Sequence, residues 1–204
     1  MSGFVRVAVL ASGSGTNLQA LLDAQGVGEM PSARVALVLS DRAGAKALER
    51  AERAGVEALA FDRVSLGRPR MEAGMLASLK ERGIELLVMA GFLTILSPGF
   101  VKSFENRIIN VHPSLIPSFC GEGFHGLRVH ESVLRRGVKI TGATVHLVDE
   151  IPDGGPILAQ EAVPVLDGDT PETLQRRVME QVEWRLLPRT VERYCRHLIL
   201  QGGV

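Results

Sequence analysis

Apolar segments of strand length recur through the first half of the chain, and their spacing constrains the fold more than any other feature. They occupy residues 5–10, 35–39, 56–61, 84–90 and 108–111. Within each segment the apolar residues are nearly continuous, which is typical of strands buried on both faces. Strands of this kind, separated by helices, form parallel sheets with right-handed crossovers. We therefore expect an α/β fold with a mostly parallel sheet.

The segments between these strands have a helical composition. Residues 17–24, 45–54 and 71–82 combine Ala and Leu with Glu, Lys and Arg, as amphipathic helices do. Helices that connect parallel strands cover both faces of the sheet, which gives a doubly wound arrangement. The N-terminal half is thus predicted to be Rossmann-like.

The pattern changes after Pro113. A Gly-rich loop at residues 118–126 precedes a predicted helix at 129–136, and two strands are expected at 139–148 and 156–165. The residues between those two strands are mostly turn formers, which predicts an antiparallel hairpin.

A long C-terminal helix is expected after the hairpin. It should begin at Asp169-Thr170-Pro171-Glu172, because Thr is a favoured capping residue and Pro is favoured in the first helical turn. The helical pattern then continues past Pro188 towards the C-terminus.

The charge balance restricts the possible partners. Lys plus Arg and Asp plus Glu number 23 each, so the chain has no excess positive charge with which to hold a polyanion. We expect small-molecule partners and no nucleic acid. A length of 204 residues fits a single domain, here residues 1–204.

Cysteine usage and the N-terminal apolar run predict the compartment. Cys120 and Cys195 form no C-x-x-C pair, so neither a disulfide framework nor a cysteine metal site is suggested. The apolar run at residues 4–11 is too short for a signal peptide or a membrane span. We expect a cytoplasmic protein without membrane attachment, either a monomer or a homodimer.

Residues 11–17, with the sequence ASGSGTN, lie between the first predicted strand and the first predicted helix. Backbone N–H groups of such a loop approach an anion at the helix N-terminus, so a phosphate is the expected occupant. Gly13 and Gly15 are followed by Leu18 where a dinucleotide motif has its third Gly, although Asp41 follows the second strand as a ribose-binding acid would. The alternative is a tight turn that simply requires Gly.

The segment Asn110-Val111-His112-Pro113 ends the fifth predicted strand. Successive side chains of a strand point to opposite faces, so Asn110 and His112 share one face while Val111 points into the core. A histidine there can serve as a general acid or base, and an amide can donate to a developing oxyanion. The alternative is a hydrogen-bonded structural histidine.

Three acids lie in the turn between the hairpin strands: Asp149, Glu150 and Asp153. A carboxylate beside His112 would favour the imidazolium and orient the ring. Spacing does not select one of the three acids, and an acidic turn is often only solvated.

The remaining histidines give little support for a metal site. They show neither H-x-x-x-H nor H-E-x-x-H spacing, and they are His125, His130, His146 and His197. No metal is therefore expected.

Several longer motifs resemble one family of enzymes. They are VLASGSGTNLQAL, MAGFLTILSP, NVHPSLIPSF, GVKITGATVHLVDEIPDGGPILAQ and DGDTPETLQRRV. Together they resemble the phosphoribosylglycinamide formyltransferase family, also called glycinamide ribonucleotide transformylases, over nearly the whole chain. The resemblance implies the formyltransferase fold, with residues 1–111 as the nucleotide-phosphate half and residues 112–204 as the folate-loop and C-terminal half.

The resemblance also implies roles for particular residues. Asn110 and His112 match the family's catalytic asparagine and histidine, and Asp153 matches its catalytic aspartate. Among the three acids of the turn, the resemblance therefore selects Asp153.

Binding residues are implied in the same way. The substrate phosphate is expected at Gly15, Thr16 and Asn17, and Glu183 is expected to contact the ribonucleotide. The folate is expected to bind at Arg68, Leu93, Thr94, Ile95, Leu96 and Asn110.

The chain departs from the family pattern at several positions. Trp184 stands where the family usually has His, and the helix between residues 174 and 183 is one residue longer than usual. Cys120 replaces a common Pro, and Thr94 stands where Arg or Lys is frequent. None of these changes affects Asn110, His112 or Asp153.

The implied reaction is formyl transfer from 10-formyltetrahydrofolate to the amine of glycinamide ribonucleotide in purine biosynthesis, without a metal. Asn110 and protonated His112 would hold the oxyanion, and Asp153 would support that protonation. Two other formyl-folate enzymes, which act on initiator methionyl-tRNA or hydrolyse the formyl folate, are expected to carry an additional domain. A non-catalytic nucleotide-binding module would leave Asn110 and His112 without a role.

Overall fold

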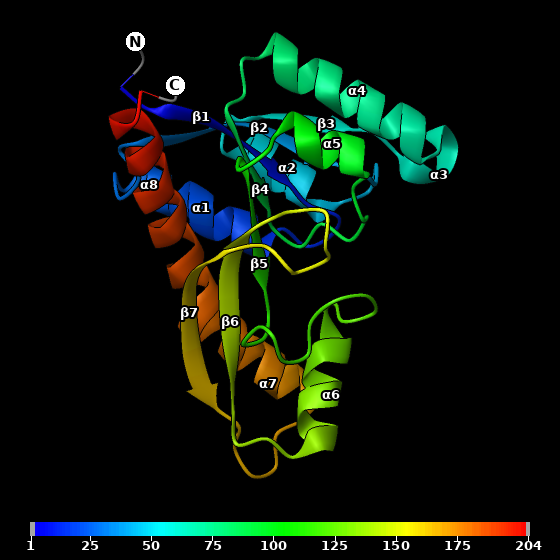
Figure 1. Ribbon diagram of the computed structural model, residues 1–204, viewed down its shortest axis with the longest axis vertical. Helices are drawn as coiled ribbons and strands as arrows, with labels where there is room; N and C mark the ends of the chain where they lie inside the picture. Colours follow the sequence, from blue (N-terminus) through cyan, green and yellow to red (C-terminus); the bar gives the residue numbers. More distant parts are fainter. Residues whose placement is uncertain (1–2, 203–204) are drawn as a thin grey trace.

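The computed structural model describes residues 3–202, and a seven-stranded sheet forms its centre (Figure 1). The strand order is β3-β2-β1-β4-β5-β6-β7. The first five strands run parallel to one another, which confirms the predicted α/β class. They are β1 (Val5–Leu10), β2 (Ala33–Ser40), β3 (Glu57–Ala60), β4 (Leu86–Met89) and β5 (Ile108–His112).

Helices cover both faces of this parallel sheet. The three predicted helices are present as α1 (Thr16–Gly26), α2 (Lys46–Arg53) and α4 (Arg68–Glu81). Two short helices were not predicted from the sequence, α3 (Arg63–Leu66) and α5 (Pro98–Ser103). Each is too short to show a helical period. A capping residue marks the start of each, Asp62 for α3 and Ser97, followed by Pro98, for α5.

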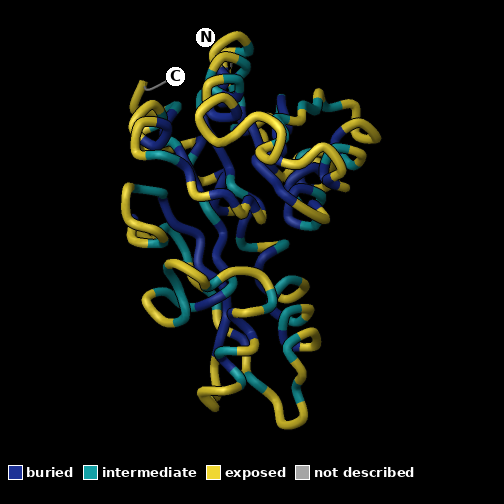
Figure 2. The backbone as a smooth tube through the Cα atoms, turned by 90° about the vertical axis from the view of Figure 1, so that its right-hand side faces the viewer, coloured by how far each residue is buried: buried dark blue, intermediate teal, exposed yellow. Residues whose placement is uncertain are grey.

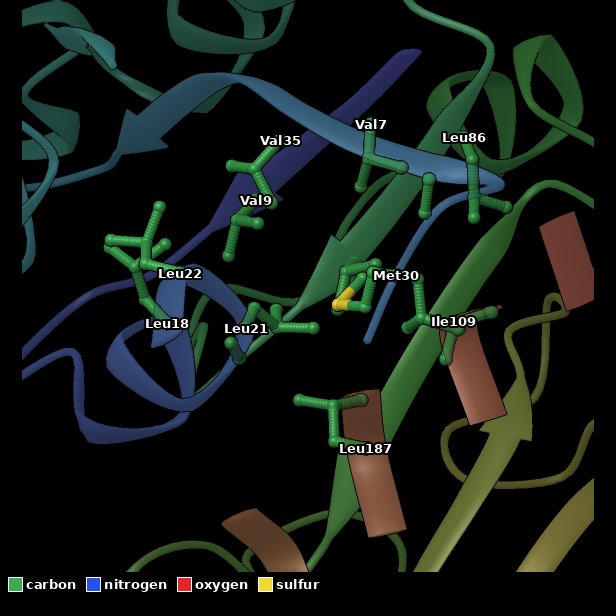
Figure 3. Packing of buried hydrophobic residues seen from close by; sticks show 14 of the residues in the cluster. Val7, Val9, Leu18, Leu21, Leu22, Met30, Val35, Leu86, Ile109 and Leu187 are labelled. Carbon is green, nitrogen blue, oxygen red and sulfur yellow. The ribbon is translucent and has the colours of Figure 1, made fainter. Parts of the chain in front are cut away.

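Alternate residues of β1 pack into two separate hydrophobic clusters. Val7 and Val9 belong to the cluster that contains Leu21 of α1, and Figure 3 shows these three side chains on one side of the sheet. Ala8 belongs to the opposite cluster, together with Met75 of α4. Burial on both faces explains why the strand sequences are continuously apolar.

The strand order reverses between β1 and β4, because the chain first builds outward through β2 and β3 and then returns. Ligands of open α/β sheets bind at such a switch point, beyond the carboxyl ends of the strands. The loops after β1 and β4 meet there: the Ser12 N–H donates to the Gly91 carbonyl at 3.0 Å, and the Leu93 N–H donates to Ser12 Oγ at 2.8 Å.

The C-terminal half extends the sheet with two antiparallel strands, as predicted. These are β6 (Ile140–Leu147), which pairs with β5, and β7 (Ile157–Pro164). Figure 1 shows both strands projecting beyond the parallel part of the sheet, with α6 (Leu127–Arg136) beside them. A third hydrophobic cluster joins α6 to the start of the C-terminal helix.

The long C-terminal helix begins where the sequence predicts. Thr170 accepts a hydrogen bond from the Thr173 N–H in a capping box, and Pro171 opens α7 (Pro171–Val178). The helix continues without a break through the π-helical turn η1 (Met179–Glu183) into α8 (Trp184–Leu200). A π-turn absorbs one extra residue within a helix, and η1 lies in the segment where the resemblance implies one.

Burial follows these layers. Figure 2 shows buried backbone running through the middle of the molecule along the strands, with exposed residues on the outer turns and loops. Across residues 3–202, no helix has both the length and the apolar character needed to cross a membrane.

Candidate active site

A cleft of about 640 Å³ lies beyond the carboxyl ends of β4 and β5. Its walls come from the loop after β4, the loop between β5 and α6, and the loop between β6 and β7. Figure 1 shows the last of these loops passing across the ends of the parallel strands. The cleft therefore lies where the switch point of the sheet predicts a ligand site.

Asn110 and His112 reach this cleft from the end of β5, and the buried Val111 between them packs into a hydrophobic core cluster. The strand ends at His112 because Pro113 follows it. Pairing with β6 sets Asn110 opposite His146 and His112 opposite Thr144. The predicted placement of an amide and an imidazole on one face is confirmed.

The ring of His112 is almost fully buried and is held at both nitrogens. Its Nε2 lies 2.9 Å from the Phe119 carbonyl oxygen, which only accepts, so Nε2 carries the proton. Its Nδ1 lies 3.5 Å from Oδ2 of Asp153. Burial lowers the pKa of His112 below its ordinary value, although Asp153 and the Phe119 hydrogen bond act in the opposite direction. Burial therefore disfavours the imidazolium form of this ring, whereas a negative charge beside the ring favours it.

Asp153 is the acid of the turn that meets His112. Its Oδ2 also accepts a hydrogen bond from the Gly121 N–H at 2.8 Å, which ties the two flanking loops together. Burial opposes ionisation of Asp153, but hydrogen bonds and the two histidines bring its pKa below the ordinary value. Asp149 instead accepts from the Ile151 N–H within its own turn.

His146 is a component of the site that sequence reasoning missed. Its Nε2 lies 3.2 Å from Nδ2 of Asn110 and 3.5 Å from Oδ1 of Asp153. Its only sequence signal is an alternation with apolar neighbours on a predicted strand, which does not reveal the residue that faces it across the sheet.

The residues expected to hold a folate line the same cleft. They are Arg68, Leu93, Thr94, Ile95, Leu96 and Asn110. Thr94 Oγ1 donates to Oδ2 of Asp41 at 2.5 Å, which fixes the loop after β4 to the end of β2. Asp41, the acid that follows the second strand, is buried beside this loop.

The loop before α1 has the form of an anion site. Gly15 has a φ of 71°, and no side chain caps the helix, so its first N–H groups remain available to a ligand. A Cβ at Gly15 would lie 2.7 Å from the Ala47 Cα, so a larger residue does not fit. Arg50 donates to the Ser14 carbonyl at 2.8 Å and places a guanidinium beside this loop.

Asn17 and Glu183 meet beside this loop in a buried contact. Asn17 Nδ2 donates to Oε2 of Glu183 at 2.6 Å, and burial raises the pKa of Glu183 to about 7. Thr16 contacts Met179 of the same π-turn and lines a separate cavity of about 520 Å³ between α1 and α8, next to Trp184. The residues expected to hold the ribonucleotide therefore form one group. They follow Ser12 in the same loop, and Ser12 contacts Leu93 in the wall of the cleft.

Cys120 is another of the departures from the family pattern. Cys120 is half-buried in the loop after β5, and its thiol donates to the Pro117 carbonyl at 3.2 Å. Burial raises the pKa of this thiol, which makes it a poor nucleophile.

Within residues 3–202, no three His, Cys, Asp or Glu side chains gather closely enough to hold a metal ion.

A family model described as formyl transferase matches residues 5–191. The chain therefore belongs to the formyl transferase family of α/β enzymes.

Individual relatives narrow this assignment. The chain is 45% identical over 201 residues to phosphoribosylglycinamide formyltransferase of Mycobacterium tuberculosis, which covers 97% of this chain and 88% of that protein. Within the formyl transferase family it is thus a member of the phosphoribosylglycinamide formyltransferases. It is also 45% identical to the trifunctional purine biosynthetic protein adenosine-3 of Gallus gallus over 98% of this chain, but it spans only 19% of that longer protein.

Solved structures agree with this assignment. Glycinamide ribonucleotide transformylase 1 from Symbiobacterium toebii superposes with a TM-score of 0.89 at 43% identity, covering 97% of this chain and 90% of that one. The corresponding enzyme from Geobacillus kaustophilus gives a TM-score of 0.87 at 41% identity, covering 94% and 99%.

Proposed function

We propose that this chain transfers the formyl group of 10-formyltetrahydrofolate to the amine of glycinamide ribonucleotide, in the de novo synthesis of purines in the cytoplasm. The observation that carries the proposal is the meeting of Asn110, His112 and Asp153 at one cleft in a formyl transferase. Acyl transfer requires a donor to the developing oxyanion and a group that moves protons, and these side chains supply both. The names of the relatives support glycinamide ribonucleotide as the acceptor.

The reaction exchanges one C–N bond for another. The amine nitrogen attacks the formyl carbon, and the carbonyl electrons move onto oxygen to give a tetrahedral intermediate. The bond to N10 of the folate then breaks as the oxyanion collapses. One amine proton is lost and N10 gains one, so the products are the formylated ribonucleotide and tetrahydrofolate.

The side chains of the cleft have distinct roles in this scheme. An Asn110 N–H donates to the oxyanion, which is the group whose charge grows most in the transition state. His112 accepts a proton as that charge develops, because the new anion offsets the cost of burying an imidazolium. Asp153 faces Nδ1 and stabilises the protonated ring. Holding both substrates in register supplies a further part of the rate.

The two substrates approach from different sides in this proposal. The phosphate of the ribonucleotide binds the free N–H groups at Gly15, Thr16 and Asn17, with Glu183 contacting the rest of the molecule. The folate occupies the cleft against Arg68 and residues 93–96.

A direct assay tests this function. Purified protein is mixed with 10-formyltetrahydrofolate and either glycinamide ribonucleotide or initiator methionyl-tRNA, and loss of the formyl folate is followed by absorbance. We expect stoichiometric transfer to the ribonucleotide and none to the tRNA. Formylation of the tRNA, or release of formate without an acceptor, would contradict the proposal.

A further inference from the structure

His146 is held in a single tautomer by its own strand. Its Nδ1 lies 2.7 Å from the carbonyl oxygen of Leu147. A carbonyl oxygen only accepts hydrogen bonds, so Nδ1 must carry a proton. The side chain is 1% exposed, so water does not compete for this contact.

This tautomer determines how Asn110 is oriented. In a neutral ring with its proton on Nδ1, Nε2 is an acceptor. The Asn110 amide must therefore present its nitrogen, not its oxygen, to His146, and Nδ2 lies 3.2 Å from Nε2. Antiparallel pairing of Asn110 with His146 across β5 and β6 fixes this contact.

The alternative is an imidazolium that donates from Nε2 to Asp153. Oδ1 of Asp153 lies 3.5 Å from Nε2, longer than the contact with Asn110 and at the limit for a hydrogen bond. An imidazolium would also require Asn110 to turn its oxygen toward the ring. The observed orientation of the amide therefore fits the neutral ring.

We propose that His146 is a positioning residue for formyl transfer, which orients the Asn110 amide so that its second N–H points to the developing oxyanion. The amide nitrogen has two protons: one goes to Nε2 of His146, and the other remains for the substrate. A reversed amide would place an oxygen lone pair beside the oxyanion and repel it. This inference rests on the proposed function for its kinetic consequence but not for its geometry.

Two substitutions separate the two nitrogens of the ring. In His146→Gln the side-chain oxygen reaches the former Nε2 position and can still accept from Asn110. In His146→Asn the amide reaches only the Nδ1 position, so it can donate to Leu147 but does not reach Asn110. We expect His146→Gln to retain most of kcat and His146→Asn to lower kcat by about tenfold to a hundredfold with little change in KM. His197→Ala, on the exposed side of α8, is the matched control with unchanged kcat.

A double-mutant cycle shows whether His146 acts through Asn110. If it does, His146→Asn should cause no further loss of kcat in an Asn110→Ala background. A general structural effect would instead lower kcat by the same factor in the wild-type and Asn110→Ala backgrounds. Equal losses of kcat in His146→Gln and His146→Asn would also indicate a general structural effect. Either result would overturn the proposal.

A measurement without substrate keeps this test independent of the proposed function. Nitrogen-15 NMR of the folded wild-type protein at pH 7.5 should show His146 protonated at Nδ1 and unprotonated at Nε2, with one Asn110 amide proton shifted by its hydrogen bond. That shift should disappear in His146→Asn. An imidazolium, or a ring protonated at Nε2, would overturn the inference even if formyl transfer is confirmed. If the spectrum is as expected but the protein shows no formyl transfer, the proposed function is wrong and the inference about the ring of His146 still holds.

Discussion

Asp153 and His112 face each other across the cleft, with 3.5 Å between Oδ2 and Nδ1. They come from different parts of the sheet, the turn between β6 and β7 and the end of β5, and a hydrogen bond from Gly121 holds the carboxylate in place. Burial lowers the pKa of His112 and the carboxylate raises it, with burial the larger effect. Negative charge on a substrate beside the ring would add to the effect of Asp153 and favour protonation of His112.

Asp153→Asn removes the charge that supports an imidazolium. The pKa of His112 should therefore fall further below its ordinary value, because burial remains and only the Phe119 hydrogen bond still opposes it. NMR titration of the His112 ring in both proteins measures this directly, and formyl transfer should fall by about a hundredfold. An unchanged or higher pKa of His112 in the variant would show that the carboxylate does not act on the ring.

Glu183 should make stability depend on pH. Its pKa rises from an ordinary value of 4.5 to about 7 on burial, so the folded state keeps a proton that the unfolded chain releases. The resulting contribution of Glu183 to the free energy of unfolding is fully present below pH 4.5. It is lost as pH rises through 7, a change of about 3 kcal/mol. Glu183→Gln keeps an acceptor for Asn17 and should raise Tm at pH 8 but not at pH 4. Equal Tm changes at the two pH values would exclude this explanation.

His130 should have the opposite effect at acid pH. It is fully buried, neither ring nitrogen has a hydrogen-bond partner within residues 3–202, and burial lowers its pKa from 6.5 to about 4. The contribution of its neutral ring to the free energy of unfolding is fully present above pH 6.5. As pH falls through 4, this contribution of about 3 kcal/mol is lost. His130→Leu should therefore unfold less readily than the wild type at pH 4, as measured by denaturant titration. If the variant shows the same acid sensitivity, another group is responsible.

Gly15 is required by the shape of its loop. An alanine there would combine a positive φ with a contact of 2.7 Å to the Ala47 backbone, so Gly15→Ala should cost roughly 2 kcal/mol of unfolding free energy. Calorimetry should also show weaker binding of glycinamide ribonucleotide. Gly13→Ala is the matched control, since its Cβ would meet nothing within 4 Å. Comparable losses in both variants would contradict a specific requirement at Gly15.

Much of the fold follows from the sequence because its signals are local. Continuous apolar strands identify the parallel sheet, and Thr170 with Pro171 marks the start of the C-terminal helix. The short helix α5 also begins with a capping residue and a proline, Ser97 and Pro98, but its six residues contain less than two helical turns, too few to show a helical period.

The candidate site was only partly predictable because its contacts are not local. Alternation along β5 is sufficient to place Asn110 and His112 on one face. His146 meets Asn110 through the register of β5 with β6, two strands joined by a long connection, and spacing along the chain does not reveal that register. Asp153 faces His112 from a turn in which it adopts a φ of 57°, a conformation that spacing in the turn does not reveal.

The measurement that tests the central claim most directly is the turnover of His112→Ala with 10-formyltetrahydrofolate and glycinamide ribonucleotide, beside the wild type. We predict that kcat falls by about a hundredfold or more, since proton transfer by a positioned side chain contributes that much. Circular dichroism and Tm should confirm that the variant is folded. Turnover close to that of the wild type in a folded His112→Ala protein would contradict the account.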